Sequence, residues 1–271
     1  MSQWNEEQMR LLGEVLPHVA QQLRIPLNNL SLAASRLTER NDSEKVQRDS
    51  AVLQQSYYRM LRLVNNLSCA PMLLDETAFL KQNVEMVAWL NGLCCQAEGL
   101  FAEKGVTLLW QCAMPYHIVA LHKEYMERLV WNLLSNALKF TPKDGTVTVS
   151  LKTAADQVLL CVTDTGCGIS DERMDSVFER WLHGEWQDAL PYGLGLGLPL
   201  CRRIAEGHGG CLLLSSREGE GTAVTVSLPD ETVSSDQIRD IAPDYAGGFQ
   251  HVMLELSDGL PFTAFTSENL E

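Results

Sequence analysis

Apolar residues recur at alternating steps of four and three along the first 70 residues, in two stretches. The first stretch runs from Leu12 to Leu37, and the second runs from Val46 to Leu67 with Ser50 as its polar interruption. This heptad spacing predicts two helices that each present one apolar seam, and Asn41-Asp42-Ser43 predicts the turn between them. Because two such seams cannot be fully buried in one chain, we expect a second copy to complete a four-helix bundle.

After residue 75 the pattern changes to strands that alternate with helices. Short apolar runs and period-two alternation predict strands, and apolar spacing of three and four predicts helices. Helices are predicted at 82–103, 123–140 and 195–208. Strands are predicted at 106–112, 117–121, 146–152, 157–164, 211–217 and 222–228. This order predicts an α+β chain: a helical hairpin, followed by an α/β sandwich in which helices cover one face of a mixed sheet.

The pattern also predicts the domain boundaries. We expect the hairpin at 1–72, the sandwich domain at 73–230 and a C-terminal extension at 231–271. In the extension, 233–242 is predicted as a short helix. The segments 249–256 and 260–265 are predicted as two strands of a hairpin, because Asp258-Gly259 is a favoured two-residue turn.

Polar residues form one stripe on the helix predicted at 123–140. Asn132, Asn136 and Lys139 stand at positions i, i+4 and i+7, and the opposite face is apolar. Mg²⁺ prefers oxygen ligands and keeps several waters, so the carbonyl of Asn136 together with phosphate oxygens would suit it. The alternative is that the stripe is the solvated face of an ordinary amphipathic helix.

Two glycine-rich segments follow the helix. Asp164 ends a predicted buried strand, and the glycines after it let backbone approach a ligand closely. A carboxylate there can accept a hydrogen bond from the exocyclic amine of adenine. The run Gly193–Gly197 opens a predicted helix, whose free N–H groups and dipole favour phosphate. Together these features indicate a nucleotide pocket.

Five stretches resemble, in order and spacing, the sequence boxes of the histidine-kinase ATP-binding domain, which belongs to the gyrase, chaperone, kinase and mismatch-repair ATPase superfamily. Five ordered matches over about 100 residues are far more specific than one glycine motif. The stretches are NLLSNALKFT (132–141), DTGCGIS (164–170), VFERW (177–181), GLGLGLPLCRRIAEGHGG (193–210) and GEGTAVTVSLP (219–229).

The resemblance implies that ATP and Mg²⁺ bind in a pocket formed by these stretches. It implies that Asn136 is the Mg²⁺ ligand, that Asp164 fixes adenine and that Thr222 supports Asp164. It also implies that Asn132 and Lys139 lie near the phosphates. Other residues that the resemblance assigns to the pocket or its lid are Phe140, Gly166, Gly168, Ile169, Phe178, Arg180, Gly193, Leu194, Gly195, Leu196, Gly197 and Leu198. ATPase members carry a Glu base at the Asn132 position, so we expect inefficient water activation here.

The first two helices resemble the dimerisation and phosphotransfer hairpin of these kinases, with a difference at the reactive site. Residues 21–27, QQLRIPL, align with the family box His-Glu-Leu-Arg-Thr-Pro-Leu. Gln21 therefore replaces the phosphoacceptor His, and Gln22 replaces the adjacent acid. An amide nitrogen is not a nucleophile, and an amide is not a general base near pH 7. His18, on a similar outward face, is the alternative acceptor, although its use would shift the target by about 4.5 Å along the helix axis.

The net charge and the cysteine content indicate which binding partners are disfavoured and in which compartment the chain is expected. The formal net charge of -14 predicts repulsion from nucleic acid and from anionic membrane surfaces. No window approaches the roughly 20 apolar residues that a membrane span needs, and the N-terminus does not resemble a signal peptide. Eight cysteines without a C-x-x-C pair are typical of the reducing cytoplasm.

Two classes of function remain open. The first is a sensor histidine kinase homologue of a two-component system, which phosphorylates His18 or a histidine on a partner subunit and signals to a response regulator. The second is a non-catalytic, nucleotide-gated pseudokinase that forms a homodimer, or a heterodimer with another histidine kinase. The pocket motifs beside a replaced acceptor favour the second class. A slow ATPase is a further alternative, disfavoured by the missing Glu base.

Overall fold

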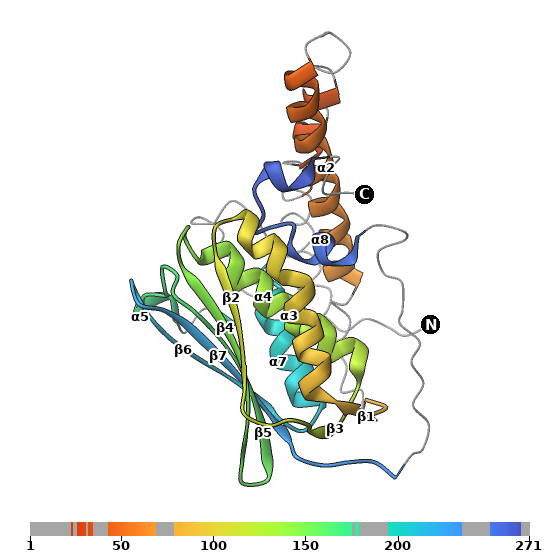
Figure 1. Cartoon of the computed structure of the whole chain (residues 1–271), viewed down its shortest axis with the longest axis vertical. Helices are drawn as coiled ribbons and strands as arrows, with labels where there is room; N and C mark the ends of the chain where they lie inside the picture. The colour runs from red at the N-terminus through yellow and green to blue at the C-terminus, as the bar shows by residue number, and fades with distance from the viewer. Residues whose placement is uncertain are drawn as a thin grey trace, which may run out of the picture.

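The structure is a computed structural model that describes residues 23, 26–30, 32–34, 43–68, 79–174, 177–178, 195–234 and 250–266. Helix α2 (Ser43–Ser68) projects from a domain made of a sheet and a layer of helices, as Figure 1 shows. None of the helices in this described part of the chain is both long and apolar enough to cross a membrane.

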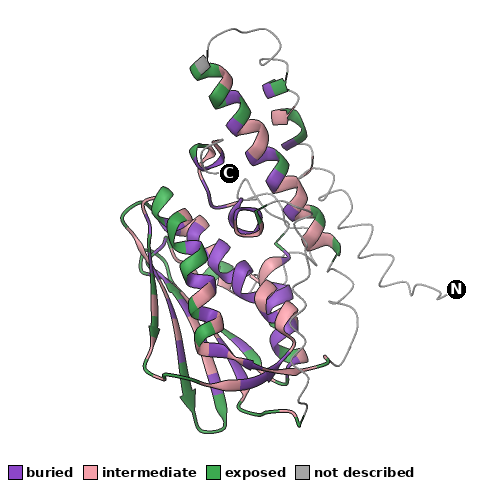
Figure 2. Cartoon of the chain, turned by 45° about the vertical axis from the view of Figure 1, so that its right-hand side comes forward, coloured by how far each residue is buried: buried purple, intermediate pink, exposed green. Residues whose placement is uncertain are grey.

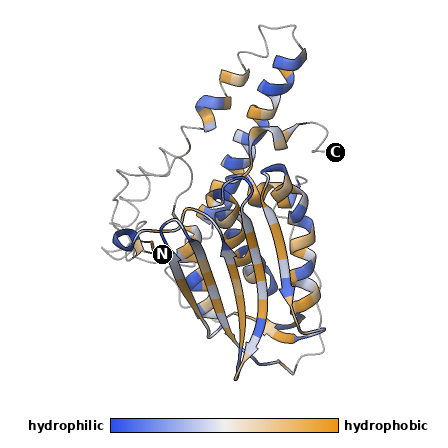
Figure 3. Ribbon diagram, turned by 60° about the vertical axis from the view of Figure 1, so that its left-hand side comes forward, coloured by the Kyte–Doolittle hydropathy of each residue, from blue (hydrophilic) through white to orange (hydrophobic). Residues whose placement is uncertain are grey.

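A five-stranded mixed sheet forms one layer of the domain, in the order β2-β4-β5-β7-β6. Strands β2 and β4 are parallel, and the other neighbouring pairs are antiparallel. The strands are β2 (Thr107–Cys112), β4 (Thr146–Ala154), β5 (Gln157–Asp164), β6 (Cys211–Arg217) and β7 (Gly221–Pro229). Hydrophobic and hydrophilic residues alternate along them (Figure 3), and this alternation sends one face of the sheet into the core. The sandwich fold expected from the sequence is therefore confirmed.

Three helices cover one face of the sheet (Figure 1). They are α3 (Met86–Glu103), α4 (Lys123–Phe140) and α7 (Gly197–Gly207), and the short helix α5 (Asp171–Met174) follows β5. Helix α4 is central, since its apolar face, including Leu129, Trp131 and Leu134, has no solvent exposure. The helices meet the sheet through this fully buried apolar layer.

The helix predicted from residue 82 begins later than expected. Residues Gln82–Glu85 form strand β1, which pairs antiparallel with β3 (Ile118–Leu121) in a separate two-stranded sheet. Glu85 stops the strand and caps α3, because its carboxylate accepts hydrogen bonds from Val87 N at 3.0 Å and Ala88 N at 2.6 Å. The cap explains why the helix starts at Met86.

The predicted C-terminal hairpin of strands is wrong. Residues His251–Leu256 form helix α8, Phe262–Phe265 form the 3-10 helix η2, and Asp258-Gly259 lies in the turn between them. Met253, Leu254 and Leu256 are all fully buried, so apolar contacts on several sides favour a helix over a half-exposed strand. Residues 235–242 of the other predicted helix lie outside the described part of the chain, and so does Phe249.

Helix α2 uses a different face from its predicted seam. Two seam residues, Tyr57 and Val64, are 39% and 52% exposed, whereas Ala51, Tyr58 and Arg62 on the other side are buried. This buried side contacts the segment that holds α8 and η2, with Tyr58 against Phe265 and Arg62 against Asp258, and Figure 2 shows α8 beside α2. The seam residues Val46, Leu53, Met60 and Leu67 are half-buried, so the described residues cover the seam only in part.

His208, at the end of α7, is buried and held in one neutral form. Its Nδ1 lies 2.7 Å from the Ile204 carbonyl oxygen, and its Nε2 accepts a hydrogen bond from His122 N at 2.9 Å. The carbonyl can only accept, so Nδ1 carries the proton and Nε2 does not. Burial lowers the pKa of His208 to about 4, and burial also lowers the pKa of His122. The role of His208 is thus structural.

We expect the chain to lose stability as the pH falls from 6.5 towards 4. His208 has a pKa of 6.5 in its ordinary state and about 4 when folded. The unfolded chain therefore binds its proton first, and the free energy of unfolding falls through this window by on the order of 2 to 3 kcal/mol. Urea unfolding of the wild type and of His208→Gln between pH 7.5 and 4.5 measures this loss. The free energy of unfolding should fall less steeply with decreasing pH in the variant than in the wild type, and an equal dependence on pH in both would contradict the expectation.

Candidate functional site

Two carboxamides on α4 face the N-terminus of α7. A Cβ atom placed on Gly197 would lie 3.3 Å from Asn132 Oδ1 and 3.8 Å from Asn136 Nδ2. Asn132 is only 2% exposed, so the polar stripe of α4 is not a solvated face. Asn136 is partly exposed, and its carboxamide makes no hydrogen bond to any residue in the described ranges. Its oxygen is therefore available to a hard cation such as Mg²⁺.

The N-terminus of α7 lies beside these carboxamides. Its N-cap residue, Leu196, makes no side-chain capping bond, and Gly195 before it has a φ of 68°. The first N–H groups of a helix have no partner within the helix, and they lie at the positive end of its dipole. The arrangement of Gly197 and Leu198 at this end therefore suits a phosphate group.

Asp164 is buried at the end of β5 and is held in place by backbone. Its Oδ1 accepts hydrogen bonds from Gly166 N at 2.9 Å and Thr222 N at 3.2 Å. Burial raises the pKa of this carboxyl, and the two N–H groups oppose that rise. Both bonds use Oδ1, so Oδ2 has no hydrogen-bond partner in the described part of the chain. That oxygen can accept from a ligand.

The turn after Asp164 lies against the C-terminal end of α4. A Cβ atom on Gly166 would lie 2.7 Å from the Phe140 carbonyl oxygen and 2.7 Å from Asp164 Oδ1, so a larger residue would displace both. Cys167 N lies 3.4 Å from the same Phe140 oxygen, to which it donates. Helix α4 thus joins the carboxamides at one end of the site to Asp164 at the other.

A second set of contacts connects the strands behind the turn. Ile169 N donates to Ser216 Oγ at 2.9 Å, and this hydroxyl lies 2.9 Å from Thr222 Oγ1. Gly168, between Asp164 and Ile169, has a φ of 67° and packs against the backbone of Arg217. These contacts fix the shape of the loop that carries Asp164.

Lys139 and Phe178 lie at the margins of the site. The Lys139 ammonium is 5.1 Å from the centroid of the Phe140 ring, and burial lowers the pKa of Lys139. Phe178 is half-buried against the core, with the Arg202 guanidinium 5.4 Å from its ring centroid. The other predicted residues, His18, Gln21, Gln22, Arg180, Gly193 and Leu194, lie outside the described part of the chain, so their roles stay predictions.

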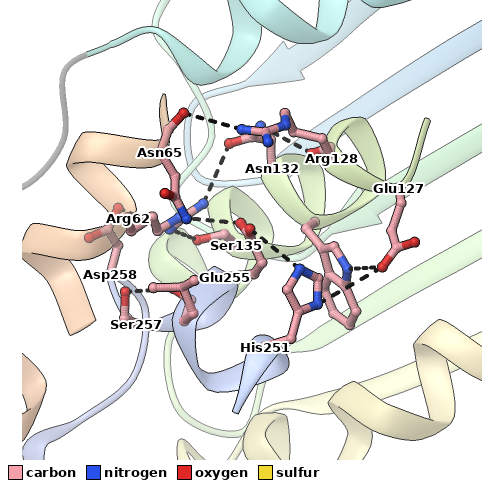
Figure 4. A network of polar contacts seen from close by, with 12 residues as sticks. Arg62, Asn65, Glu127, Arg128, Asn132, Ser135, His251, Glu255, Ser257 and Asp258 are labelled. Carbon is pink, nitrogen blue, oxygen red and sulfur yellow. Dashed lines mark hydrogen bonds and ion pairs between the residues drawn. The ribbon is translucent and has the colours of Figure 1, made fainter. Parts of the chain in front are cut away.

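A polar network around Arg62 also reaches the site, and sequence reasoning missed it (Figure 4). The guanidinium of Arg62, on α2, donates to Ser135 Oγ at 2.5 Å and Asp258 Oδ2 at 2.9 Å, and lies 3.5 Å from Asn132 Oδ1. No local pattern could have indicated this, since Arg62 and Asp258 are 196 residues apart. The hairpin helix thus contacts a residue of the candidate site directly.

Comparison with known families covers both halves of the chain. Residues 122–232 match the family described as histidine kinase-, DNA gyrase B- and HSP90-like ATPase. Residues 11–68 match the His Kinase A phospho-acceptor domain. The two matches correspond to the sandwich domain and to the helical hairpin.

The chain is similar in sequence to curated sensor kinases. The adaptive-response sensory kinase SasA of Gloeothece citriformis is 30% identical over 232 residues, which are 82% of this chain and 59% of that protein. The alginate biosynthesis sensor protein KinB of Pseudomonas aeruginosa is 28% identical over 230 residues, which are 81% of this chain and 37% of that protein. The chain therefore spans only part of the length of these relatives.

Solved structures share the fold. The histidine kinase ThkA, in complex with the response regulator protein TrrA, matches 83% of this chain and 64% of its own with a TM-score of 0.64 at 19% identity. Full-length ShkA in complex with AMPPNP matches 81% of this chain and 46% of its own with a TM-score of 0.58 at 22% identity. At these identities the likeness shows the fold alone.

Proposed function

Because the chain belongs to the sensor histidine kinases, with a His Kinase A hairpin and a histidine kinase-type ATPase domain, we propose that it binds Mg·ATP between α4 and the N-terminus of α7. One observation carries the proposal. Asn132 and Asn136 face the N-terminal end of α7 at Gly197, while Asp164, beside the C-terminal end of α4, has one carboxylate oxygen without a hydrogen-bond partner among the described residues.

Each residue has a distinct role in this proposal. The Oδ2 atom of Asp164 accepts a hydrogen bond from the exocyclic amine of adenine, and Thr222 N holds the carboxylate in position. Asn136 is the protein ligand of Mg²⁺, which when bound neutralises phosphate charge. The N–H groups that begin α7 receive the phosphates, with Lys139 nearby. Phe178 takes the place of the residue that anchors the mobile lid over ATP in the family that the chain resembles.

We further propose that the chain is a nucleotide-gated pseudokinase. Gln21 and Gln22 supply neither a nucleophile nor a general base for phosphotransfer. Asn132 stands where ATPase members carry a Glu base, so hydrolysis is expected to be slow. The alternative is a sensor histidine kinase that phosphorylates His18 or a histidine of a partner subunit, and signals to a response regulator.

The hairpin supports a dimer. Tyr57 and Val64, on the apolar seam of α2, are 39% and 52% exposed, so a second copy would bury them in a four-helix bundle. Either a homodimer or a heterodimer with another histidine kinase would bury the apolar residues of the seam. The cytoplasm, where ATP is abundant, is the proposed location.

Incubation with γ-labelled ATP tests the choice between pseudokinase and kinase. We expect the wild type to bind ATP without becoming labelled, because Gln21 cannot accept the phosphoryl group. The double variant Gln21→His with Gln22→Glu is expected to gain acid-labile label, since it restores the nucleophile and the base.

The same double variant carrying Asn136→Ala is the matched control and should stay unlabelled. Acid-labile label on the wild type that disappears in His18→Ala would instead identify a working kinase. An unlabelled double variant that still binds ATP would mean that the geometry for phosphotransfer has also been lost.

A further inference from the structure

The C-terminal segment 250–266 lies beyond residue 232, where the ATPase family match ends, and packs between the hairpin helix and the ATPase domain. In Figure 2 its helix α8 lies between α2 and the helices of the domain. The apolar residues that it buries are Met253, Leu254, Leu256, Leu260, Ala264 and Phe265. The segment is therefore a folded link between the two parts.

Three polar or aromatic contacts fasten this segment to α2. Gln55 Nε2 donates to the Leu260 carbonyl at 2.8 Å, and Arg59 Nε donates to the Ser257 carbonyl at 3.2 Å. The Tyr58 and Phe265 rings lie 5.5 Å apart, centroid to centroid. These three contacts fall within about one turn of α2, on one face of the helix.

The acidic side chains of the segment hold Arg62 against the candidate site. Arg62 is 4% exposed, and its guanidinium lies 2.9 Å from Asp258 Oδ2 and 3.8 Å from Glu255 Oε2. The same guanidinium contacts Ser135 and Asn132 on α4 (Figure 4). A buried guanidinium requires such counter-charges, so the acidic groups keep Arg62 where it is.

Both polar atoms of the Asn132 side chain have a partner in this docked arrangement. Its Oδ1 faces Arg62 at 3.5 Å, and its Nδ2 donates to the Arg128 carbonyl at 3.0 Å. Arg62 on the oxygen therefore helps to keep the Asn132 amide group, the donor that a phosphate would need, on the Arg128 carbonyl.

Asp258 also lies near a second cation, Lys139, in the last turn of α4. A Cβ atom on Gly259 would lie 3.1 Å from Lys139 N, which places the Asp258-Gly259 turn on the last turn of α4. The Asp258 carboxylate favours the charged form of Lys139, against the repulsion from Arg62 and Arg59. One acidic turn therefore takes up two cations, Arg62 and Lys139, that the phosphates of a nucleotide would otherwise attract.

We propose that segment 250–266 is an intramolecular brake on nucleotide binding, in which Asp258 competes with the phosphates and Arg62 is the positioning residue that withholds Asn132. Docking of the segment and binding of Mg·ATP oppose each other, and each weakens the other by the same factor. The inference rests on the proposed nucleotide site.

Calorimetric titration of the full chain with Mg·ATP tests the brake. Asp258→Asn keeps the shape of the turn but removes its charge, so it should lower the Kd about tenfold. Glu231→Gln is the matched control, because it removes one negative charge from the exposed ion pair with Lys81. The control should bind as the wild type does. A Kd for Asp258→Asn that is unchanged or higher would overturn the brake and leave the nucleotide site intact.

Hydrogen exchange of the wild-type chain gives a second test that needs no variant. Amides of the docked segment, such as those of Leu254 and Gly259, should exchange faster when Mg·ATP is saturating, since the segment is released. Unchanged or slower exchange would overturn the brake even if Asp258→Asn failed to fold. Absence of nucleotide binding in both the wild type and Asp258→Asn would overturn the nucleotide site and the brake with it.

Discussion

Replacing Asp164 by Asn is expected to weaken ATP binding by about 100-fold or more, corresponding to about 2.7 kcal/mol. Oδ1 of the new side chain can still accept from Gly166 N and Thr222 N, so the turn should keep its shape. The position of Oδ2 would instead carry an NH₂ group, which cannot accept from the exocyclic amine of adenine. Calorimetry of the full chain with Mg·ATP measures the loss.

Asp156→Asn is the matched control for this prediction. Asp156 is exposed in the turn between β4 and β5, away from the site, and the substitution is chemically the same. It should bind ATP like the wild type, and both variants should unfold at similar temperatures. If Asp164→Asn bound ATP as tightly as Asp156→Asn, Asp164 would not be the group that recognises adenine.

Replacing Asn136 by Ala is expected to remove the contribution of Mg²⁺ to nucleotide binding. The wild type should bind ATP at least about tenfold more tightly with Mg²⁺ than with a chelator, because the metal links the carboxamide to the phosphates. In the variant, the two affinities should become equal. Titrations with and without the metal measure this difference.

Asn91→Ala, on the exposed side of α3, is a control of the same chemistry. It should keep the full dependence on Mg²⁺. A dependence on Mg²⁺ in Asn136→Ala as large as in the control would mean that another group holds the metal.

The sandwich and much of the site could be predicted because their signals are local. The bounds of α4, Lys123–Phe140, follow from its own apolar spacing, and β5 ends at Asp164 as expected. Gly166 and Gly197 were assigned to the pocket by the family resemblance. The structure shows how close Gly166 and Gly197 lie to residues of α4.

The C-terminal segment could not be predicted for a physical reason. A short apolar run such as 249–256 fits a strand or a buried helix equally well, and only its surroundings decide. Here α2, α3 and α4 surround it, and these helices are distant in the sequence. The same separation concealed the role of Arg62, whose position outside the seam of α2 has no local signal.

Titration of the whole chain with ATP in the presence of Mg²⁺ tests whether the chain binds this nucleotide. We predict saturable binding at one site per chain, with a rise in the unfolding temperature that requires both ATP and the metal. If neither the wild type nor Asp258→Asn showed heat of binding or thermal stabilisation at millimolar Mg·ATP, the result would contradict the proposed nucleotide site.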